Sequence, residues 1–410
     1  MLTHTLSGRT QYYLQLEEDF GAHNYHPLPV VLEKGKGVFA WDVDGKRYYD
    51  FLSGYSAVNQ GHCHPRIIQA LVEQAQKLTL TSRAFYNNLL GEYEKFATEY
   101  FGYDKLLPMN TGVEAVETAL KLCRRWGYEK KGIKDGEAKI VVCENNFHGR
   151  TTTVISFSTD EQSNAKFGPY TPGFIIIPYN DTDALQKALE DKNVAGFLVE
   201  PIQGEAGVCV PDEGYLSKAK QLCEAYNVLF IGDEIQTGLG RTGKMLACDH
   251  ENVRPDILIL GKALSGGTIP VSAVFADNDI MMTIKPGEHG STYGGNPLAC
   301  AVAMESLKVL KEENMLQNAD AMGALMRGEI AKLNSPFIST IRGKGLLNAI
   351  VIEHANKDAA WELCLALKEN GLLAKPTHGD KIRFAPPLTI TREQILECVD
   401  IIRRSLKILL

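Results

Sequence analysis

The sequence predicts an α/β protein in which a mostly parallel central sheet, with helices on both faces, is joined to a smaller α+β domain. The first observation is that short, uninterrupted apolar runs alternate with helical patterns between about residues 139 and 275. Such runs are typical of strands buried on both faces, and their alternation with helices indicates a parallel sheet. The second observation is that several runs end in loops with polar residues that a packed core would exclude. Because open α/β sheets bind ligands at the carboxyl ends of their strands, we expect these loops to carry the function.

A hairpin and two helices are predicted ahead of the sheet. The stretch Val38–Phe51 alternates around Asp44-Gly45, which is a strong hairpin signal. One helix is predicted over Ile67–Leu78, and a second begins at about Thr111-Gly112. The apolar face of the first helix is predicted to consist of Ile68, Leu71, Val72 and Ala75. The strands of the sheet, with a helix near 213–225 among them, are predicted as Ile140–Cys143, Ala195–Val199, Val228–Ile231, Ile257–Leu260 and Val271–Phe275.

The chain after residue 295 predicts the smaller domain. Asn296 is placed to cap a helix that has Pro297 at its first position. Strands over Ile341–Ile352 and Lys381–Pro387 flank a helix near 357–370, and Thr391–Gln394 forms a capping box for a final helix. We therefore predict an N-terminal segment, 1–50, that joins the small domain, a large domain over 51–295, and a small domain over 296–410.

Composition and charge exclude several classes of protein. The 410 residues are 44% hydrophobic, and 43 basic against 50 acidic residues give a net charge of −7. Lys and Arg are spread along the chain, so we expect neither nucleic acid nor a membrane surface as a partner. No apolar run reaches the roughly 20 residues of a membrane span. The N-terminus lacks a signal or transit pattern, so we predict a cytoplasmic protein, or a mitochondrial-matrix protein if a leader has been removed.

The cysteines and histidines do not predict a metal site. The nine cysteines are scattered without a Cys-x-x-Cys pair, which is typical of reduced thiols. The string Gly61–Pro65 contains two histidines and a cysteine, but adjacent side chains rarely converge on one ion. We predict a turn there and no metal.

Lys262 is the residue with the clearest chemistry. It follows the predicted buried strand Ile257–Leu260 and a single glycine. A partly desolvated amine loses its proton more readily than its ordinary pKa of about 10.4 implies, because burial disfavours the charged form. A neutral lysine amine attacks carbonyl carbons and forms Schiff bases. Taken alone, Lys262 also fits a lysine that ends a strand near solvent.

Three further strand or helix ends complete a set with this lysine. Asp233 offers a carboxylate after one strand, and Phe147 offers an aromatic ring after another. At Gly112 and Val113 a glycine-bearing loop enters a helix, whose free N–H groups suit a phosphate. Pyridoxal phosphate needs all four: a Schiff-base lysine, a carboxylate at the pyridine nitrogen, a phosphate cradle and a stacking ring. The set predicts a pyridoxal phosphate enzyme, although Asp233 and the helix start also fit ordinary capping positions.

Nearly the whole chain, from about residue 20 to residue 408, resembles the class III (ω-) aminotransferases of the fold-type I pyridoxal phosphate enzymes. The resemblance implies an enzyme that transfers the δ-amino group of L-ornithine to 2-oxoglutarate, yielding glutamate 5-semialdehyde and glutamate. It also implies a homodimer with active sites at the subunit interface. The strings that carry the resemblance are Gly21–Tyr25, Tyr55–Pro65, Gly204–Gly207, Asp233–Gly238, Leu260–Gly267, Gly287–Pro297 and Leu373–Gly379.

The resemblance assigns the cofactor contacts position by position. Lys262 matches the Schiff-base lysine, and Asp233 matches the partner of the pyridine nitrogen. Gln236 matches the residue at the phenolic oxygen. The remaining matches are Gly112 and Val113 to the phosphate-binding helix start, Phe147 to the stacking ring, and Thr292 to a threonine that reaches the phosphate from the neighbouring subunit.

The resemblance also assigns the substrate contacts. It implies that Arg150 takes the α-carboxylate of ornithine, with Tyr25 and Tyr55 shaping the α-amino end. Glu205 and Arg383 match a pair that switches between the two substrates. While paired they neutralise each other, and a dicarboxylate can displace Glu205 to bind the guanidinium in a bidentate manner. The alternative is a permanent ion pair that is unconnected with substrate.

One string points to other amines as well. Phe147–Arg150 is equally similar to acetylornithine and 4-aminobutyrate aminotransferases, so these activities are the alternative. We expect His148, within this string, to line the entrance. Tyr55 and the string Gly21–Tyr25 favour ornithine, because a hydroxyl near the α-amino group suits a free amine better than an acetylated one.

Overall fold

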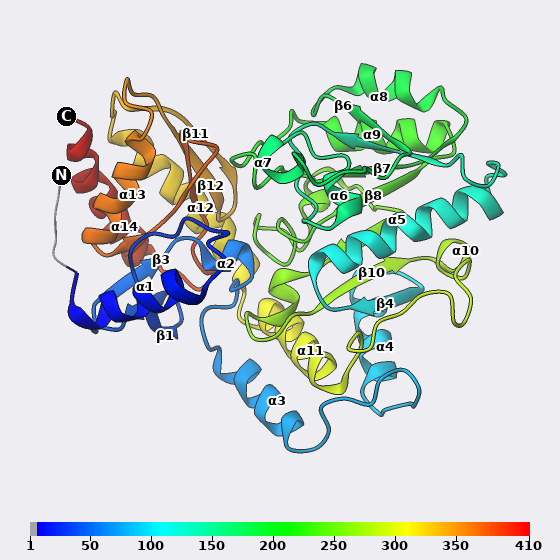
Figure 1. Ribbon diagram of the computed structural model, residues 1–410, viewed down its shortest axis with the longest axis horizontal. Helices are drawn as coiled ribbons and strands as arrows, with labels where there is room; N and C mark the ends of the chain where they lie inside the picture. The colour runs from blue at the N-terminus through cyan, green and yellow to red at the C-terminus, as the bar shows by residue number, and fades with distance from the viewer. Residues whose placement is uncertain (1–5) are drawn as a thin grey trace.

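A seven-stranded sheet forms the centre of the larger of two units (Figure 1). The structure, a computed structural model, describes residues 6–410. Strands β5 to β9 pair in parallel, while β10 is antiparallel to both of its neighbours, so the predicted mostly parallel sheet is confirmed. In spatial order the strands are β4 (Lys105–Met109), β10 (Ser272–Ala276), β9 (Ile257–Leu260), β8 (Leu229–Asp233), β7 (Val194–Val199), β5 (Lys139–Cys143) and β6 (Phe174–Ile177).

Helices cover both faces of this sheet, as predicted. Helix α5 packs on one face, whereas α8 and α9, and further along α4 and α11, cover the other. The helices of the larger unit are α2 (Ser53–Ser56), α3 (Pro65–Ala75), α4 (Leu90–Phe101), α5 (Gly112–Glu129), α6 (Thr152–Ile155), α7 (Glu161–Asn164), α8 (Thr182–Leu189), α9 (Tyr215–Ala225), α10 (Asn278–Met281) and α11 (Pro297–Glu312), with the 3-10 helices η1 (Ala247–Glu251) and η2 (Lys262–Ser265).

Strand β9 is fixed between these two layers. Its four side chains are fully buried. Ile257 and Ile259 pack in the cluster that contains α5, whereas Leu258 and Leu260 pack in the cluster on the opposite face. Burying each of these side chains contributes roughly 1.5–3 kcal/mol, so the residues that follow the strand are held firmly at the edge of the sheet.

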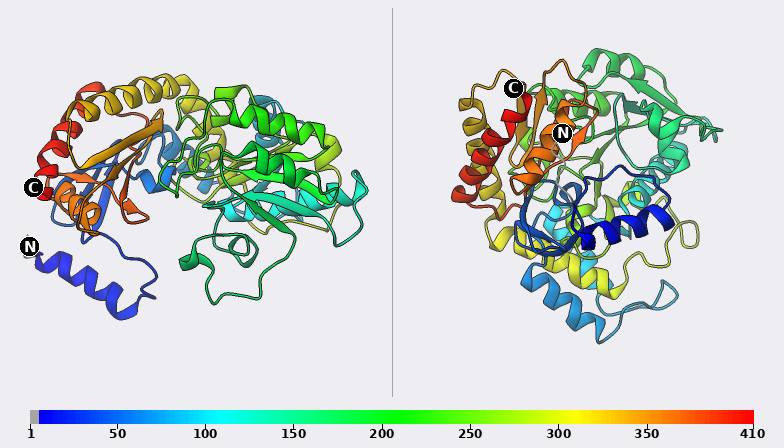
Figure 2. Two further views of the ribbon diagram at one scale, coloured as in Figure 1. Left: turned by 90° about the horizontal axis from the view of Figure 1, so that it is seen from above. Right: turned by 60° about the vertical axis from the view of Figure 1, so that its left-hand side comes forward.

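The smaller unit contains two four-stranded sheets and carries both the first and the last described residues of the chain (Figures 1 and 2). The short strand β13 pairs in parallel with β3, so the N-terminal segment joins the C-terminal part in one sheet. One sheet is β1 (Leu32–Lys36), β2 (Phe39–Asp42), β3 (Arg47–Asp50) and β13 (Leu372–Leu373), and the other is β11 (Ile338–Lys344), β12 (Leu347–Ile352), β15 (Lys381–Phe384) and β14 (Pro376–Thr377). The helices are α1 (Gly8–Phe20), α12 (Met315–Lys332), α13 (Ala359–Glu369), α14 (Arg392–Ser405) and η3 (Leu406–Leu409).

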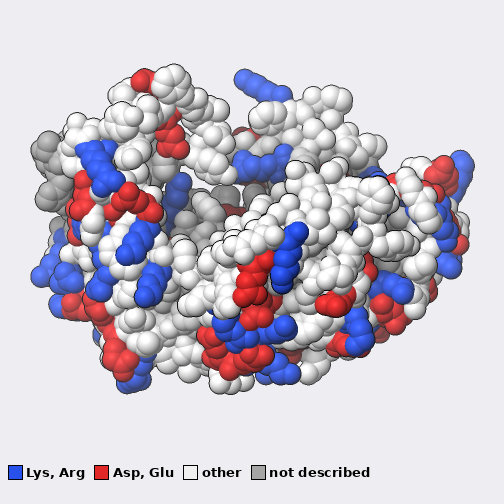
Figure 3. All heavy atoms as spheres, turned by 90° about the horizontal axis from the view of Figure 1, so that it is seen from below, with Lys and Arg blue, Asp and Glu red and all other residues white. Residues whose placement is uncertain are grey.

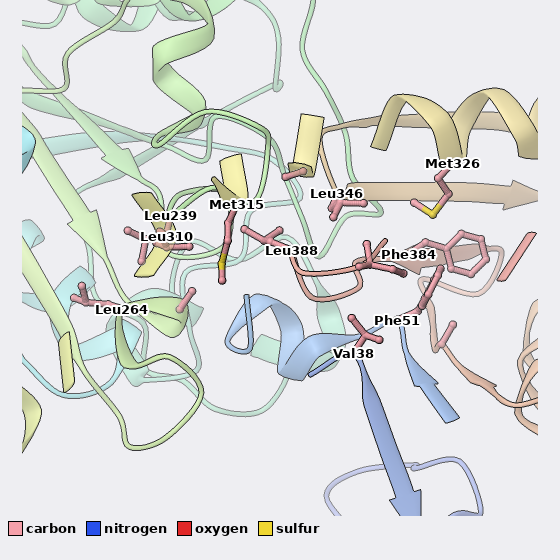
Figure 4. Packing of buried hydrophobic residues seen from close by; sticks show 14 of the residues in the cluster. Val38, Phe51, Leu239, Leu264, Leu310, Met315, Met326, Leu346, Phe384 and Leu388 are labelled. Atoms are coloured by element: carbon pink, nitrogen blue, oxygen red, sulfur yellow. The ribbon is translucent and has the colours of Figure 1, made fainter. Parts of the chain in front are cut away.

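The predicted domain boundaries stay a prediction. Helix α11 packs on α3 and α4 in the larger unit and also on α12 in the smaller unit. The apolar core is likewise continuous between the two units (Figure 4). Leu264 and Leu310 on one side are joined through Met315 and Leu388 to Phe384 on the other.

Most predicted helix starts and turns are confirmed. The hairpin turns at Asp44-Gly45 between β2 and β3, and Thr111, Asn296 and Thr391 cap their helices through side-chain oxygens. The predicted apolar face of the helix over 67–78 is right for Leu71, which packs against the core, and wrong for Val72 and Ala75, which are exposed. Helix α3 packs against α11, which buries Ile67 completely and leaves Val72 49% exposed.

Helix α1 was not predicted, and it stands apart from the rest of the chain in Figure 2. Thr10 is its only buried residue, so none of its apolar side chains is buried against the rest of the protein. Its contacts are polar instead: Ser7 and Thr10 donate to Asp44, and Arg9 pairs with Glu33.

Charges and histidines on the surface form pairs. On the face drawn in Figure 3, Lys and Arg side chains are interspersed with Asp and Glu. His62 Nε2 lies 2.7 Å from Asp50, and His64 Nε2 lies 3.2 Å from Glu313, so each ring has a carboxylate partner. Over residues 6–410, no helix has the length and apolar character needed to cross a bilayer.

Arg241 joins the two units through a buried guanidinium. Its hydrogen bonds all go to neutral oxygens: Asn59 Oδ1 at 2.6 and 3.1 Å, Leu346 O at 3.1 Å and Pro386 O at 2.6 Å. Arg241 is completely buried, so these bonds replace its hydration. The residue therefore fixes a loop of the larger unit against two segments of the smaller one.

Replacing Arg241 by leucine should destabilise the protein strongly. The change leaves three buried oxygens without a donor, and each such loss costs about 1–3 kcal/mol. We expect the free energy of unfolding, measured by urea titration, to fall by roughly 3 kcal/mol or more. Arg403→Leu, which removes an exposed ion pair with Asp400, is the control and should change it little. Equal stability of the two variants would contradict the assigned role of Arg241.

Candidate active site

A cavity of about 180 Å³ lies where β5, β7, β8 and β9 end. We call this side of the sheet the carboxyl edge. Six predicted residues line the cavity: Gly112, Val113, Phe147, Asp233, Gln236 and Lys262. Four lining residues were not predicted as cavity residues: His148, Gly149, Glu200 and Ile235. The carboxyl edge therefore brings together the residues that the sequence analysis placed at separate strand ends.

Lys262 is the first residue after the Ile257–Leu260 strand and Gly261, and its backbone is strained. Its φ of 43° lies in the left-handed region, which non-glycine residues rarely adopt. Such a conformation costs of order 1 kcal/mol and persists only where the surroundings impose it. Burial lowers the pKa of the Lys262 amine, against the opposing charge of Glu205. The amine is thus held in the cavity and loses its proton readily, as predicted.

Asp233 is held by a histidine that the sequence analysis placed elsewhere. His148 Nδ1 lies 2.6 Å from Asp233 Oδ2, and both side chains are buried. The expectation that His148 lines the entrance is wrong, because its ring turns inward to this carboxylate. Burial, the largest single influence, lowers the pKa of His148, but the hydrogen bond to Asp233 and the negative charges of Asp233 and Glu200 together outweigh burial and raise the pKa. The Ile235 N–H donates to the other oxygen of Asp233 at 3.1 Å, which fixes the carboxylate.

The start of helix α5 forms the opposite end of the cavity. Thr111 and Glu114 make a capping box, and Gly112 and Val113 are the first two helical residues. The N–H groups of a first helical turn have no partner within the helix and suit an anion. Gly149 has a φ of 127°, and a Cβ there would lie 2.4 Å from a methyl carbon of Val113. Only glycine therefore lets the loop after β5 approach the helix start so closely.

Glu205 and Arg383, which we call the switch pair, form a partly buried ion pair beside this cavity. Arg383 Nη1 donates to Glu205 Oε1 at 2.8 Å and to Gln236 Oε1 at 3.2 Å. Gln236 in turn donates to Glu205 at 3.2 Å. Burial, the largest single influence, raises the pKa of Glu205, but the charges of Arg383 and Lys262 and the hydrogen bonds to Glu205 together outweigh burial and lower the pKa. The Arg383 Nε atom is buried without a partner among the described residues, and the Tyr55 ring lies 5.0 Å from the guanidinium carbon.

Besides Tyr55, Glu205 and Arg383, three further predicted residues lie outside the cavity. Tyr25 is 65% exposed, and Arg150 is exposed with its guanidinium 5.8 Å from the Phe147 ring. Thr292 is exposed and does not line the cavity of its own chain. The substrate roles of Tyr25 and Arg150 and the cofactor role of Thr292 stay predictions.

Glu200 is the buried cavity residue with the most perturbed carboxyl group. It follows β7 directly, and its oxygens accept the Phe147 N–H at 2.9 Å and the Gly204 N–H at 3.3 Å. Burial raises its pKa from 4.5 to about 7, with Asp233 adding to the shift and His148 opposing it. A carboxylate placed directly after a fully apolar run was the signal that could have revealed it.

A desolvated lysine, a fixed carboxylate and a helix start at one sheet edge define a site for an aldehyde cofactor that carries a phosphate. The chain belongs to the aminotransferase class-III family, which matches residues 20–406. This confirms the predicted family and the predicted fold.

Ornithine aminotransferases are among its most similar relatives. The mitochondrial ornithine aminotransferase of Rattus norvegicus is 63% identical and covers 97% of this chain and 90% of its own length. A solved ornithine aminotransferase from Toxoplasma gondii superposes with a TM-score of 0.96 at 51% identity, over 98% of this chain and 94% of its own. A solved acetylornithine aminotransferase from Elizabethkingia anophelis superposes with a TM-score of 0.89 at 61% identity, over 97% of this chain and 98% of its own.

The cavity fits pyridoxal phosphate, the cofactor of this family. The close contact of Gly149 with Val113 leaves the first turn of α5 facing the cavity, where a phosphate would bind. Asp233 offers a fixed carboxylate for a ring nitrogen, and Lys262 offers an amine for an aldehyde. The donors and acceptors present therefore match the phosphate, the ring nitrogen and the aldehyde of the cofactor.

The raised pKa of Glu200 predicts a pH-dependent stability. A group whose pKa is higher in the folded than in the unfolded protein stabilises the fold fully below its unfolded pKa, here 4.5. This stabilisation is lost as the pH rises through the folded pKa of about 7. Glu200→Gln lacks this dependence. We expect the free energy of unfolding of the wild type, relative to that of Glu200→Gln and measured on cofactor-free protein, to fall by about 2 kcal/mol between pH 5 and pH 8. Parallel pH profiles for the two proteins would contradict the assignment.

Proposed function

We propose that the chain transfers the δ-amino group of L-ornithine to 2-oxoglutarate, giving glutamate 5-semialdehyde and L-glutamate. The observation that carries the proposal is the switch pair next to Lys262. Arg383 is neutralised by Glu205 at 2.8 Å, yet its Nε remains buried and unpaired among the described residues. A site that must accept an amine first and a dicarboxylate second requires such an arrangement.

Acetylornithine is the second candidate substrate, because a structure 61% identical to this chain is an acetylornithine aminotransferase. The rat and Toxoplasma gondii relatives support ornithine. Tyr55 also supports ornithine, since its ring lies 5.0 Å from the Arg383 guanidinium carbon, beside the switch pair. A hydroxyl in that position suits a free α-amino group.

The residues of the cavity divide the chemistry among themselves. Pyridoxal phosphate, when bound, supplies an aldehyde and an electron-withdrawing ring that makes the C–H bond beside the substrate nitrogen acidic. Lys262 would bond to that aldehyde and, once released by the incoming amine, would carry the proton between the carbon atoms that lose and gain it. Asp233, held by His148, would keep the ring nitrogen protonated.

The switch pair would separate the two half-reactions. While Glu205 is paired with Arg383, the guanidinium would not attract a substrate carboxylate, and the amine-bearing end of ornithine could approach Lys262. A 2-oxoglutarate or glutamate carboxylate would then displace Glu205 and bind the planar guanidinium through two hydrogen bonds. Because an unpaired buried charge costs about 3–5 kcal/mol, the exchange must accompany substrate binding. Arg150 would hold the α-carboxylate at the other end.

The proposal includes a homodimer. Thr292 lies outside its own cavity, so it would reach the phosphate of the partner's site. The neighbouring Tyr293 is 58% exposed, and Phe85 is 74% exposed. These two segments meet through Gly295 and Leu90, and together they would form part of the interface. The cytoplasmic location stays a prediction. The rat relative is a mitochondrial protein.

The proposed substrate can be tested by assaying the purified enzyme with ornithine, acetylornithine and 4-aminobutyrate side by side. Production of the semialdehyde, with 2-oxoglutarate as acceptor, is measured for each amine. We expect the kcat/KM for ornithine to exceed the others by at least about a hundredfold, since an acetyl group leaves buried polar groups unpaired. A preference for acetylornithine would replace the proposal by the second candidate.

Replacing Glu205 by alanine should shift the enzyme toward glutamate. The variant leaves Arg383 uncompensated, so it favours a carboxylate at the site from the start. We expect the kcat/KM ratio of glutamate to ornithine, from single half-reactions, to rise by roughly tenfold or more. Glu353→Ala, on the surface of the smaller unit, is the control. An unchanged ratio in Glu205→Ala would leave the pair a structural contact only.

A further inference from the structure

Glu200 lies between two loops that carry different parts of the active site. The loop after β5, residues 144–150, is the stacking loop, and the loop after β7, residues 200–207, is the switch loop. Glu200 begins the switch loop, is only 6% exposed, and its backbone carbonyl accepts the Tyr179 hydroxyl at 3.1 Å. Its main chain is thus fixed at the carboxyl edge by the end of a buried strand.

Each carboxylate oxygen of Glu200 holds a different loop. Oε1 accepts the N–H of Phe147 in the stacking loop at 2.9 Å, and Oε2 accepts the N–H of Gly204 in the switch loop at 3.3 Å. Hydrogen bonds in a buried, low-dielectric site are electrostatically stronger than in water. One side chain therefore sets the distance between these two backbone positions.

Both positions are followed immediately by residues of the site. His148 comes after Phe147 and bonds to Asp233 at 2.6 Å. Glu205 comes after Gly204 and pairs with Arg383 at 2.8 Å. A Cβ on Gly204 would lie 2.0 Å from Gln236 Oε1, so the switch loop also packs directly on Gln236. Movement at either end is transmitted to Glu200 through a single peptide unit.

We infer that Glu200 is a positioning residue that couples the two loops, so that the placement of the cofactor ring and the closure of the switch pair are set together. The inference deepens the proposed function and rests on it. Neither loop needs to move far: a shift at Gly204 would alter the acceptor geometry at Phe147. The alternative is a link that stabilises the fold without influencing the site.

Three variants test the inference. Glu200→Gln keeps the size of the side chain but replaces one acceptor oxygen by a donor, so only one loop can be held. Glu200→Asp keeps the charge, shortens the reach and serves as the milder change if the amide variant folds poorly. Asp256→Asn is the matched control, because Asp256 also holds a backbone N–H, that of Phe230 at 2.7 Å, yet does not line the cavity.

Two quantities are measured on each purified holoenzyme. The first is the dissociation constant of pyridoxal phosphate, with the absorbance maximum of the bound cofactor. The second is the ratio of the ornithine to the glutamate half-reaction in single turnovers. We expect Glu200→Gln to weaken cofactor binding and to lower the ratio, each by about tenfold, which is the effect of losing one buried hydrogen bond. Glu200→Asp should move both in the same direction by less, and Asp256→Asn should move neither.

The outcomes are distinct from those of the proposed function. If Glu200→Gln loses stability but keeps the wild-type dissociation constant, absorbance and ratio, Glu200 is a structural link and the inference is overturned. A change in only one of the two quantities also overturns it, because coupling requires both. If the wild type proves inactive with ornithine, the proposed function fails. The ratio of half-reactions is then measured with the amine that the enzyme does accept, and the same criteria decide the inference.

Discussion

Parallel pairing of neighbouring strands is the constraint on which the site depends. Register places Cys143 near Val199, Val199 beside Gly232, and Asp233 beside Ile259. The loops that leave these strands consequently start at one level of the sheet. Residues more than a hundred positions apart in the chain meet there because their strands end together. The chemistry follows from where the strands stop.

The second constraint is the contact between the two units. Arg241 bonds to Leu346 O and Pro386 O, and the apolar core runs through the same region. Pro386 lies two residues beyond the end of β15, the strand that carries Arg383. The buried guanidinium of Arg241 thus helps to hold the second arginine at the cavity. The same contacts of Arg241 thus stabilise the junction of the two units and position Arg383 at the active site.

Sequence reasoning succeeded where a residue's position follows from a strand end. Lys262, Asp233 and Phe147 were found because apolar runs mark buried strands and polar residues follow them. It failed where position depends on the direction of a side chain. His148 turns inward to a carboxylate 85 positions away, and nothing local in the sequence indicates that direction. Helix α1 was missed because polar bonds, not an apolar face, keep it in place.

The switch pair also crosses the boundary between the units. Arg383 lies on β15 of the smaller unit, whereas Glu205 belongs to the loop after β7 of the larger one. In the proposed exchange, a dicarboxylate that displaces Glu205 would remove one of the bonds that keep the two units together, and it would supply a new bond to only one of them. Binding of the second substrate would then also loosen the contact between the two units, so the rigidity of the protein would depend on which substrate is bound.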